Sequence, residues 1–311
     1  MRIIGSSLLI FFIMATTLAE PEEMNRLSTS NSVYEVTLVD EKPLECCPYL
    51  KRFTFNITYK MTKQIGRFTL GDAEKRLRSI REIYLKGDKL IVKGNLRRGS
   101  AISVIDLKRR KLDDFFWCYK PTSSPSNRFL VYIKYFPPHG LPSIRTDVVL
   151  IYDMKRKPSE NRVPVKGYTK QPKEQVGLPI YPTPYVKAKA YLLSEQQYWP
   201  PSWRYDVSSP FLWSEDEKKV VFLCTHHNQT YVVKVDLSLG IEKPKISELP
   251  IKIAKKMVKP KYLGGFKLDL MRGSKKDRIL FADQIEWDGP DHIIVKPEEY
   301  YLKEEIRLPV P

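Results

Sequence analysis

Two short runs of basic residues are the groups in this sequence best suited to bind an anionic partner. One run follows Ile105-Asp-Leu107 and the other follows Tyr152-Asp-Met154. Because both follow the same kind of segment, we expect them to occupy equivalent turns of successive repeats and to form one positive face. A scattered set of solvated charges is the alternative. The predicted anion-binding residues are Lys108, Arg109, Arg110, Lys111, Lys155, Arg156 and Lys157.

A stretch rich in aromatic residues and proline, between Tyr181 and Tyr205, is a second candidate binding feature. Exposed tyrosine and tryptophan rings can stack on sugars or anchor a peptide, because they offer a flat apolar face with a polar edge. Large aromatic residues more often fill a buried core, which is the competing interpretation. The candidate binding residues of this aromatic loop are Tyr181, Tyr185, Tyr198, Trp199 and Trp203.

Motifs of the common catalytic sites are missing from the sequence. It contains no GxSxG, GxGxxG, Walker or HExxH pattern, and His226 and His227 fall in a predicted hairpin turn. A group of carboxylates in another predicted hairpin lacks the spacing of a calcium-binding loop; its members are Asp283, Glu286, Asp288 and Asp291. We therefore predict no catalytic residue, no metal site and no cofactor.

Residues 1–19 have the composition of a cleaved secretory signal. Met1-Arg2 is basic, the segment from Ile3 to Met14 is apolar, and small residues precede a cleavage point after Ala19. An uncleaved anchor is the alternative. We expect a periplasmic or secreted protein without a transmembrane segment after cleavage, because no later apolar run is long enough to span a bilayer.

Export also bears on the four cysteines. An even number in an oxidising compartment favours disulfides, and four cysteines allow three pairings. A bond between the adjacent Cys46 and Cys47 would be strained, so we expect one of them to pair with Cys118 or Cys224. The rival interpretation, a metal site, lacks the CxxC spacing that such sites use.

The overall charge is strongly positive. The 311 residues include 53 Lys and Arg against 36 Asp and Glu, which gives a formal net charge of +17. Because the protein is expected outside the cytoplasm, nucleic acid is not predicted as its partner. An acidic envelope polymer, anionic lipid head groups or an acidic protein are the candidates. The sequence does not indicate an oligomeric state.

From about residue 80 the chain consists of pairs of short strands separated by polar turns. The second strands of three pairs end at Asp106, Asp153 and Asp236, at intervals that fit a repeat of roughly 40 to 50 residues. Residues 72–80 predict a short helix, and residues 33–39 and 53–59 alternate like strands. These two strands would complete the first repeat or pair with the C-terminal segment to close a ring. The expected pairs are 89–93 with 101–106, 128–133 with 147–153, 219–223 with 230–236, and 278–282 with 292–295.

The segment Ser209-Pro-Phe-Leu-Trp-Ser-Glu-Asp-Glu-Lys-Lys-Val-Val-Phe222 resembles the blade motif of TolB-type, WD-like β-propeller repeats. Ser124-Pro-Ser-Asn-Arg-Phe-Leu-Val-Tyr132 is similar to it, and residues 281–295 look like the hairpin that follows. Glu217 stands where the family usually has glycine, and Glu215 stands where it has proline. The resemblance covers about residues 80–300 and implies an all-β propeller fold, but it implies no activity because propellers host many functions.

We therefore expect an all-β protein, a β-propeller of about five or six four-stranded blades, with a β-sandwich as the alternative. Its expected parts are a signal at 1–19, a flexible tail at 20–32, and one domain at 33–311 with a Pro/Tyr-rich insertion at about 158–205. The expected function is non-enzymatic binding of a protein or an anionic envelope component. The alternatives are a secreted hydrolase of glycans or peptides, with its site in the propeller channel, and a structural envelope protein.

Overall fold

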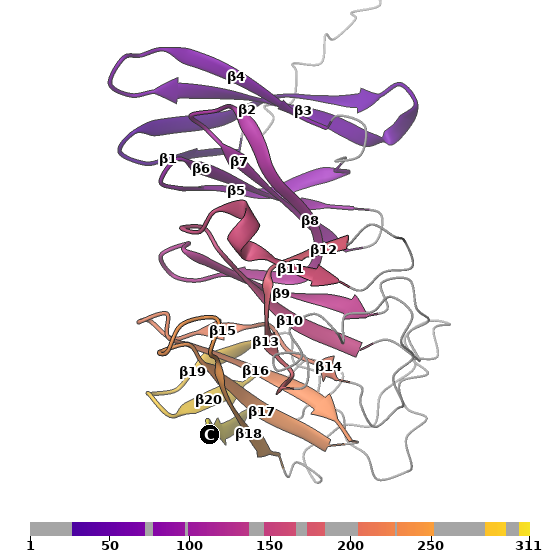
Figure 1. The fold of residues 1–311 in the computed structure, drawn as a ribbon, viewed down its shortest axis with the longest axis vertical. Coiled ribbons are helices and arrows are strands. Elements are labelled where there is room, and N and C mark those ends of the chain that lie inside the picture. Colours follow the sequence, from indigo (N-terminus) through magenta and orange to yellow (C-terminus); the bar gives the residue numbers. More distant parts are fainter. Residues whose placement is uncertain are drawn as a thin grey trace, which may run out of the picture.

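The computed structural model describes residues 27–71, 77–96, 99–136, 146–165, 173–183, 205–227, 229–251, 284–296 and 305–311. These residues form β-strands and one short 3-10 helix (Figure 1), so the all-β class is confirmed. Among them, no helix is long and apolar enough to cross a membrane.

The strands assemble into five successive antiparallel units, of which units 2 and 3 share strand β8 and so belong to one seven-stranded sheet. Unit 1 contains β1 (Ser28–Ser30), β2 (Tyr34–Leu44), β3 (Cys47–Tyr59) and β4 (Ile65–Leu70). Unit 2 contains β5 (Ser79–Lys86), β6 (Lys89–Asn95), β7 (Ser100–Asp106) and the first part of β8 (Lys111–Ser123). Unit 3 contains the end of β8, then β9 (Phe129–Phe136), β10 (Thr146–Asp153) and β13 (Leu178–Tyr181).

Units 4 and 5 complete the series. Unit 4 contains two short strands that both pair with β16 and together take the place of a first strand, β14 (Asp206–Val207) and β15 (Leu212–Trp213). Its second, third and fourth strands are β16 (Lys219–His226), β17 (Gln229–Asp236) and β18 (Lys245–Pro250). Unit 5 contains β19 (Ile285–Trp287), β20 (His292–Val295) and β21 (Ile306–Pro309). A side hairpin between β10 and β13 contains η1 (Pro158–Asn161), β11 (Arg162–Val165) and β12 (Lys173–Val176).

Four apolar clusters hold the units together, one between each pair of neighbours. Strand β10 shows how a sequence produces this packing. Val148, Leu150 and Tyr152 face unit 2, whereas Val149 and Ile151 face unit 4, because successive side chains of a strand point to opposite faces. In a two-sheet sandwich each sheet buries one face, whereas the inner units here are buried on both faces. Stacked antiparallel sheets of this kind are the repeat unit of β-propellers, whose blades pack face to face.

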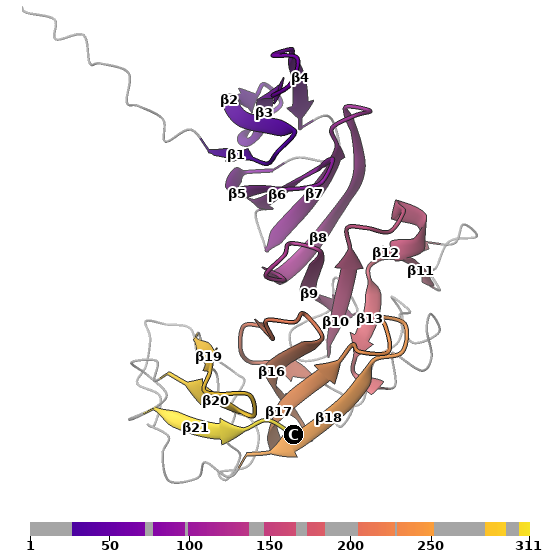
Figure 2. The same cartoon turned by 90° about the vertical axis from the view of Figure 1, so that its left-hand side faces the viewer.

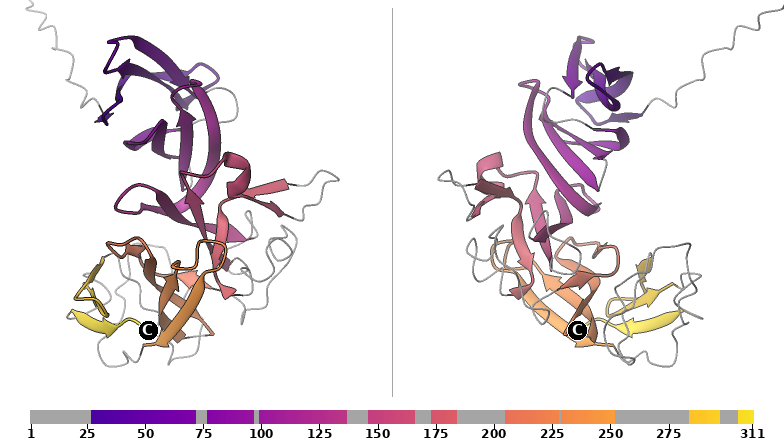
Figure 3. Two further views of the ribbon diagram at one scale, coloured as in Figure 1. Left: turned by 60° about the vertical axis from the view of Figure 1, so that its left-hand side comes forward. Right: turned by 90° about the vertical axis from the view of Figure 1, so that its right-hand side faces the viewer.

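The units follow one another along a curve (Figures 2 and 3). The β1–β4 sheet and the β19–β21 sheet lie at its two ends. Among the described residues no strand of one pairs with a strand of the other. The predicted pairing of N-terminal strands with the C-terminal segment is therefore not found there. Strands β2 and β3 also do not complete the first predicted repeat, which lies in unit 2, but form a separate sheet with β1 and β4.

Three of the four predicted strand pairs are confirmed as β6–β7, β9–β10 and β16–β17. In the fourth, residues 278–282 lie outside the described residues, and β20 pairs with β19 and β21. The predicted helix over 72–80 is wrong at its end, because Ser79 and Ile80 belong to β5; the segment 72–76 lies outside the described residues.

Two other expected boundaries change. Part of the predicted flexible tail, Ser28–Ser30, is strand β1, which pairs with β2; residues 1–26, including the predicted signal, lie outside the described residues. The predicted insertion at 158–205 provides η1, the β11–β12 hairpin and strand β13. Strand β13 pairs with β10 and is the fourth strand of unit 3.

Candidate functional site

The same turn is built three times, in units 2, 3 and 4. Asp106, Asp153 and Asp236 each end the third strand, and each accepts a backbone N–H from two or three residues further on, at 2.7, 2.9 and 2.8 Å. The residue after each aspartate donates its own N–H to the turn between the first two strands of that unit. A short carboxylate that bonds the following backbone N–H stabilises such turns. The repeated aspartates are therefore structural.

The turns between the first and second strands are also equivalent. Gly87, Asn127 and Glu217 have φ values of 56°, 56° and 58° at the same place in units 2, 3 and 4. Positive φ is natural for glycine and costs other residues energy. Glu217 therefore adopts a backbone conformation that is natural for glycine.

Both sets of turns lie at the same ends of the strands, along the left-hand side of Figure 1. We call this edge the turn face. Hydrogen bonds connect it from unit to unit: Asn31 Nδ2 donates to Gly87 O at 2.9 Å, Lys86 Nζ donates to Ser126 O, and Ser126 Oγ donates to Glu217 Oε2 at 2.8 Å. The turn face is thus a continuous surface across units 1 to 4.

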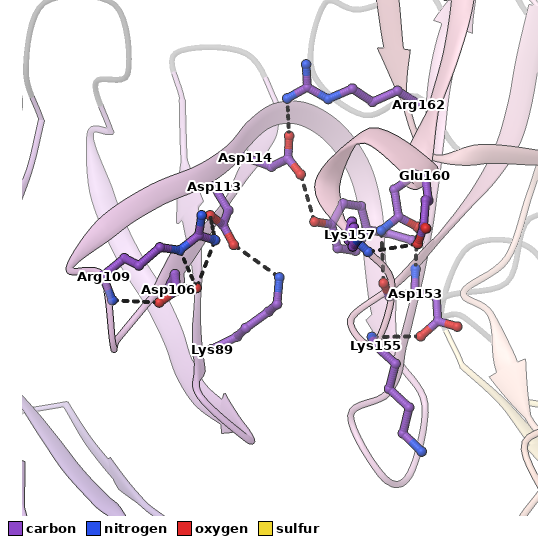
Figure 4. Close-up of polar contacts among 12 residues, drawn as sticks. Lys89, Asp106, Arg109, Asp113, Asp114, Asp153, Lys155, Lys157, Glu160 and Arg162 are labelled. Atoms are coloured by element: carbon purple, nitrogen blue, oxygen red, sulfur yellow. Dashed lines mark hydrogen bonds and ion pairs between the residues drawn. The ribbon is translucent and has the colours of Figure 1, made fainter.

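The structure places both basic runs on the turn face, in equivalent turns of units 2 and 3 (Figure 4). Three of these basic residues form ion pairs with neighbouring carboxylates. Lys108 lies 2.7 Å from Asp88, and Arg109 lies 2.9 and 3.0 Å from Asp106 and Asp113. Arg156 lies 2.9 Å from Glu242 of unit 4.

The remaining members of the two runs lie outside these ion pairs. Lys111, Lys155 and Lys157 are exposed. Arg110 is also exposed at its own position, but its guanidinium lies close against the backbone of Gly66 in unit 1. The two basic runs therefore share one face, as expected from the sequence. Fewer of their positive charges are free of ion pairs than the composition implies.

A cationic hollow of about 710 Å³ opens at the opposite edge, between units 1 and 2. Three basic residues and an exposed tyrosine surround it together with polar groups of the β6–β7 turn; its lining is Tyr49, Lys51, Arg78, Ser79, Arg81, Asn95, Leu96, Gly99 and Ser100. Arg78 and Arg81 are exposed. Lys51 pairs with Glu41 on the neighbouring strand.

Two structural features place these groups around one opening. The backbone N–H of Lys51 donates to Leu77 O at 2.9 Å and attaches β3 to the start of β5. The buried side chain of Leu77 lies against Gly94 and fills the space beneath. The hollow was not predicted from the sequence, because a helix over residues 72–80 would separate Arg78 and Arg81 from β3.

The predicted aromatic loop is only partly described. Tyr181 is completely buried, packs against Tyr205 and Phe222, and donates its hydroxyl to Glu248 Oε1 at 2.8 Å. Its predicted role as an exposed binding residue is therefore wrong, and the core alternative holds for this residue. The other four candidates, Tyr185, Tyr198, Trp199 and Trp203, lie outside the described residues.

The predicted disulfides are not formed, and all four cysteines lie in the described residues. Cys118 is buried between units 2 and 3, whereas Cys224 is buried between units 3 and 4. Cys46 and Cys47 lie at the β2–β3 turn of unit 1. Burial raises the pKa of Cys118 to about 12 and the pKa of Cys224 well above its usual value, so both thiols stay protonated at neutral pH and are poor nucleophiles.

A histidine–carboxylate pair closes one end of the interface between units 3 and 4. His226 is buried, stacks on Tyr231 at 4.2 Å between ring centroids, and has Nε2 3.4 Å from Glu248 Oε2. Burial alone would raise the pKa of Glu248, but the contacts with His226 and the Tyr181 hydroxyl lower it. The thiol of Cys224, on the same strand as His226, stays protonated because burial raises its pKa. The His226–Glu248 pair therefore has no thiolate nucleophile beside it and serves to position side chains.

The predicted carboxylate hairpin of unit 5 is occupied by internal ion pairs. Glu286 lies 2.8 Å from Lys296, Asp288 pairs with Arg307, and Asp291 lies 2.8 Å from His292. Asp283 lies outside the described residues. Within the described part of the chain, no group of three or more metal-ligating side chains is close enough to hold an ion.

No model of a known protein family matches this sequence, and no curated protein matches it. Solved structures with some similarity include the β-propeller domain of the trilobed protease from Pyrococcus furiosus, with 9% identity, a TM-score of 0.29, and coverage of 92% of this chain and 84% of that one. The periplasmic gluconolactonase of Pseudomonas aeruginosa shows 9% identity, a TM-score of 0.26, and coverage of 92% and 85%.

Hydrazine synthase of Kuenenia stuttgartiensis shows 9% identity and a TM-score of 0.28, over 68% of this chain and 65% of that one. The present chain thus spans slightly less than two thirds of the length of that protein. Scores this low do not establish a relationship. The resemblance to TolB-type repeats stays a prediction from the sequence.

Proposed function

We propose that this chain is an exported, non-enzymatic binding protein that recognises an acidic glycan of the cell envelope or extracellular space through the cationic hollow. The observation that carries the proposal is the convergence of Lys51, Arg78 and Arg81 with the exposed Tyr49 ring around one opening. Guanidinium groups bind carboxylates in a planar, bidentate way. A tyrosine ring offers the flat apolar face on which a sugar can stack.

The size and openness of the hollow support this occupant. Its volume of about 710 Å³ lies in the range of sites that hold small ligands, roughly 300 to 1,000 Å³. Tyr49 keeps 53% of its surface exposed, which leaves its ring accessible. The polar residues Asn95 and Ser100 at the rim can hydrogen-bond to sugar hydroxyls.

The test measures binding of a defined oligogalacturonate by calorimetry at moderate salt. The variant Arg78→Ser/Arg81→Ser removes both guanidinium groups of the hollow, and we expect affinity to fall at least about tenfold, or about 1.4 kcal/mol. The matched control, Lys155→Ser/Lys157→Ser, removes the same charge from exposed positions of the turn face. We expect it to bind as the wild type does.

Other outcomes would contradict the proposal in distinct ways. Equal weakening by both variants would show that overall positive charge, and not the hollow, attracts the glycan. Loss in the lysine variant alone would place the anion site on the turn face. Hydrolysis of the oligosaccharide during the titration would replace the binding protein with the hydrolase alternative.

A further inference from the structure

The turns of unit 1 expose three apolar side chains at the turn face. Val33, Met61 and Ile65 keep 41%, 90% and 66% of their surface exposed. We call them the apolar tip. The backbone of the β3–β4 turn joins the β1–β2 turn, because Lys60 N donates to Val33 O at 2.9 Å. Ile65 begins β4 and closes the β3–β4 turn. The three residues therefore belong to one end of one sheet.

Two basic side chains lie beside the apolar tip. Lys63 is exposed in the β3–β4 turn itself, and Arg67 is exposed two residues after Ile65 and hence on the same side of β4. The Arg110 guanidinium of unit 2 lies against Gly66 on the opposite face of β4, toward unit 2, and so does not border the apolar tip. Among the described residues no carboxylate pairs with Lys63 or Arg67.

The geometry points to a membrane-docking surface: we propose that the apolar tip inserts into an anionic lipid bilayer while Lys63 and Arg67 contact its head groups. Isolated apolar side chains on turns gain free energy when they enter the interface of a bilayer. Basic residues near an anionic membrane add electrostatic attraction that salt weakens. Charge complementarity selects the lipid surface, because Lys63 and Arg67 outweigh Glu35, the exposed carboxylate that lies in register with Ile65 through Thr58.

This surface is separate from the cationic hollow. The hollow includes the β6–β7 turn, whereas the apolar tip adjoins the β5–β6 turn through the bond from Asn31 to Gly87. These two turns lie at opposite ends of the same strands. A protein docked through the tip would therefore present the hollow away from the membrane, and each surface can be removed without changing the other.

The test is flotation with vesicles of phosphatidylcholine alone or mixed with phosphatidylglycerol. The protein is the chain that begins at Glu20, which keeps every residue the structure describes and lacks the apolar segment before Ala19. We expect it to float with the mixed vesicles and to be released by high salt. The variant Met61→Ser/Ile65→Ser should lose at least about tenfold in partitioning.

Two further variants keep the test specific. Trp117→Ser removes an equally large exposed apolar side chain, 54% exposed, from the other end of unit 2, and should float as the wild type does. Met61→Trp keeps an apolar tip, and its fluorescence should shift to the blue and be quenched by brominated lipid tails.

The proposal fails if the Met61→Ser/Ile65→Ser variant floats like the wild type, or if Met61→Trp shows no quenching. It also fails if soluble glycerophosphoglycerol displaces the protein completely, because that would show a head-group pocket without insertion. The Arg78→Ser/Arg81→Ser variant should float normally, so failure here is distinguishable from failure of glycan binding.

Discussion

Glu217 of unit 4 has the same positive-φ backbone conformation as Gly87 and Asn127, which stand at the equivalent positions of units 2 and 3. Its side chain explains why the unfavourable φ is kept. The carboxylate accepts the backbone N–H of Ser126 and, at 2.8 Å, the Ser126 hydroxyl. These bonds connect the turn of unit 4 to the turn of unit 3, which no glycine could do.

The same contacts predict a dependence on pH. Burial would raise the pKa of Glu217, but hydrogen bonds from Ser126 N–H and from the Ser124 and Ser126 hydroxyls lower it below its ordinary 4.5. A lowered pKa stabilises the folded protein above pH 4.5, and this contribution is lost as pH falls through the folded value.

In Glu217→Gln, we expect lower stability than in the wild type at neutral pH and a difference that shrinks in acid. Urea unfolding at several pH values measures it. A difference that is constant across pH would show that the carboxylate charge is not what holds the turns together.

At the scale of single elements, the turn between β6 and β7 depends on a close approach. Gly99 has φ +93°, and a Cβ there would lie 2.8 Å from the Tyr119 ring. That ring is held in turn by Tyr135, 3.9 Å away between centroids. Glycine is therefore required at position 99 both by the positive φ and by the close Tyr119 ring.

Gly240 offers a matched comparison, because it has φ +95° and no atom lies within 4 Å of the position that a Cβ would occupy. We expect Gly240→Ala to cost about 1 to 2 kcal/mol through the backbone alone. Gly99→Ala should cost clearly more, because the Tyr119 ring must also move. Equal free energies of unfolding for the two variants would show that Tyr119 yields without cost.

Elements with a strong local pattern could be predicted from the sequence, and those that depend on distant partners could not. The runs 147–153 and 219–223 are β-branched and bounded by turn residues, so their strands and partners follow from local pattern alone. Strand β5 begins within a charged segment, DAEKRLRSI, that has helical character locally. Its pairing with β6 overrides that tendency.

The candidate sites follow the same division. The shared face of the two basic runs was predictable because both follow a repeated aspartate. The cationic hollow was not, because Lys51 and Arg78 meet only once β3 is attached to Leu77. Residue type indicated a buried core only as one of two interpretations of Tyr181, and the separation of the cysteines into different clusters cannot be derived from residue types, since it depends on how the units stack.

At the scale of the whole molecule, stability resides in the clusters between units. Leu77 is fully buried in the cluster between units 1 and 2, directly next to Arg78 of the hollow. Units that contact only their neighbours share stability through such interfaces, as in repeat proteins. Damage at this interface should therefore affect the hollow as well as the fold.

For Leu77→Ala we expect a loss of about 2 to 5 kcal/mol in the free energy of unfolding, from lost burial and the cavity left behind. Oligogalacturonate affinity should fall with it, because β3 and β5 lose their common support. Leu239→Ala, at a site 75% exposed, should change stability by less than about 0.5 kcal/mol. Unchanged glycan affinity in a destabilised Leu77→Ala protein would contradict the coupling.

Strand β8 is continuous through two units, pairing with β7 over residues 111–118 and with β9 over residues 119–123. A gene that grows by duplicating repeats must be cut where no strand is shared. Cuts after β4 or after β13 satisfy this condition, but a cut between units 2 and 3 divides β8. We therefore expect units 2 and 3 to be gained or lost as one block, with any change in repeat number falling on either side of them.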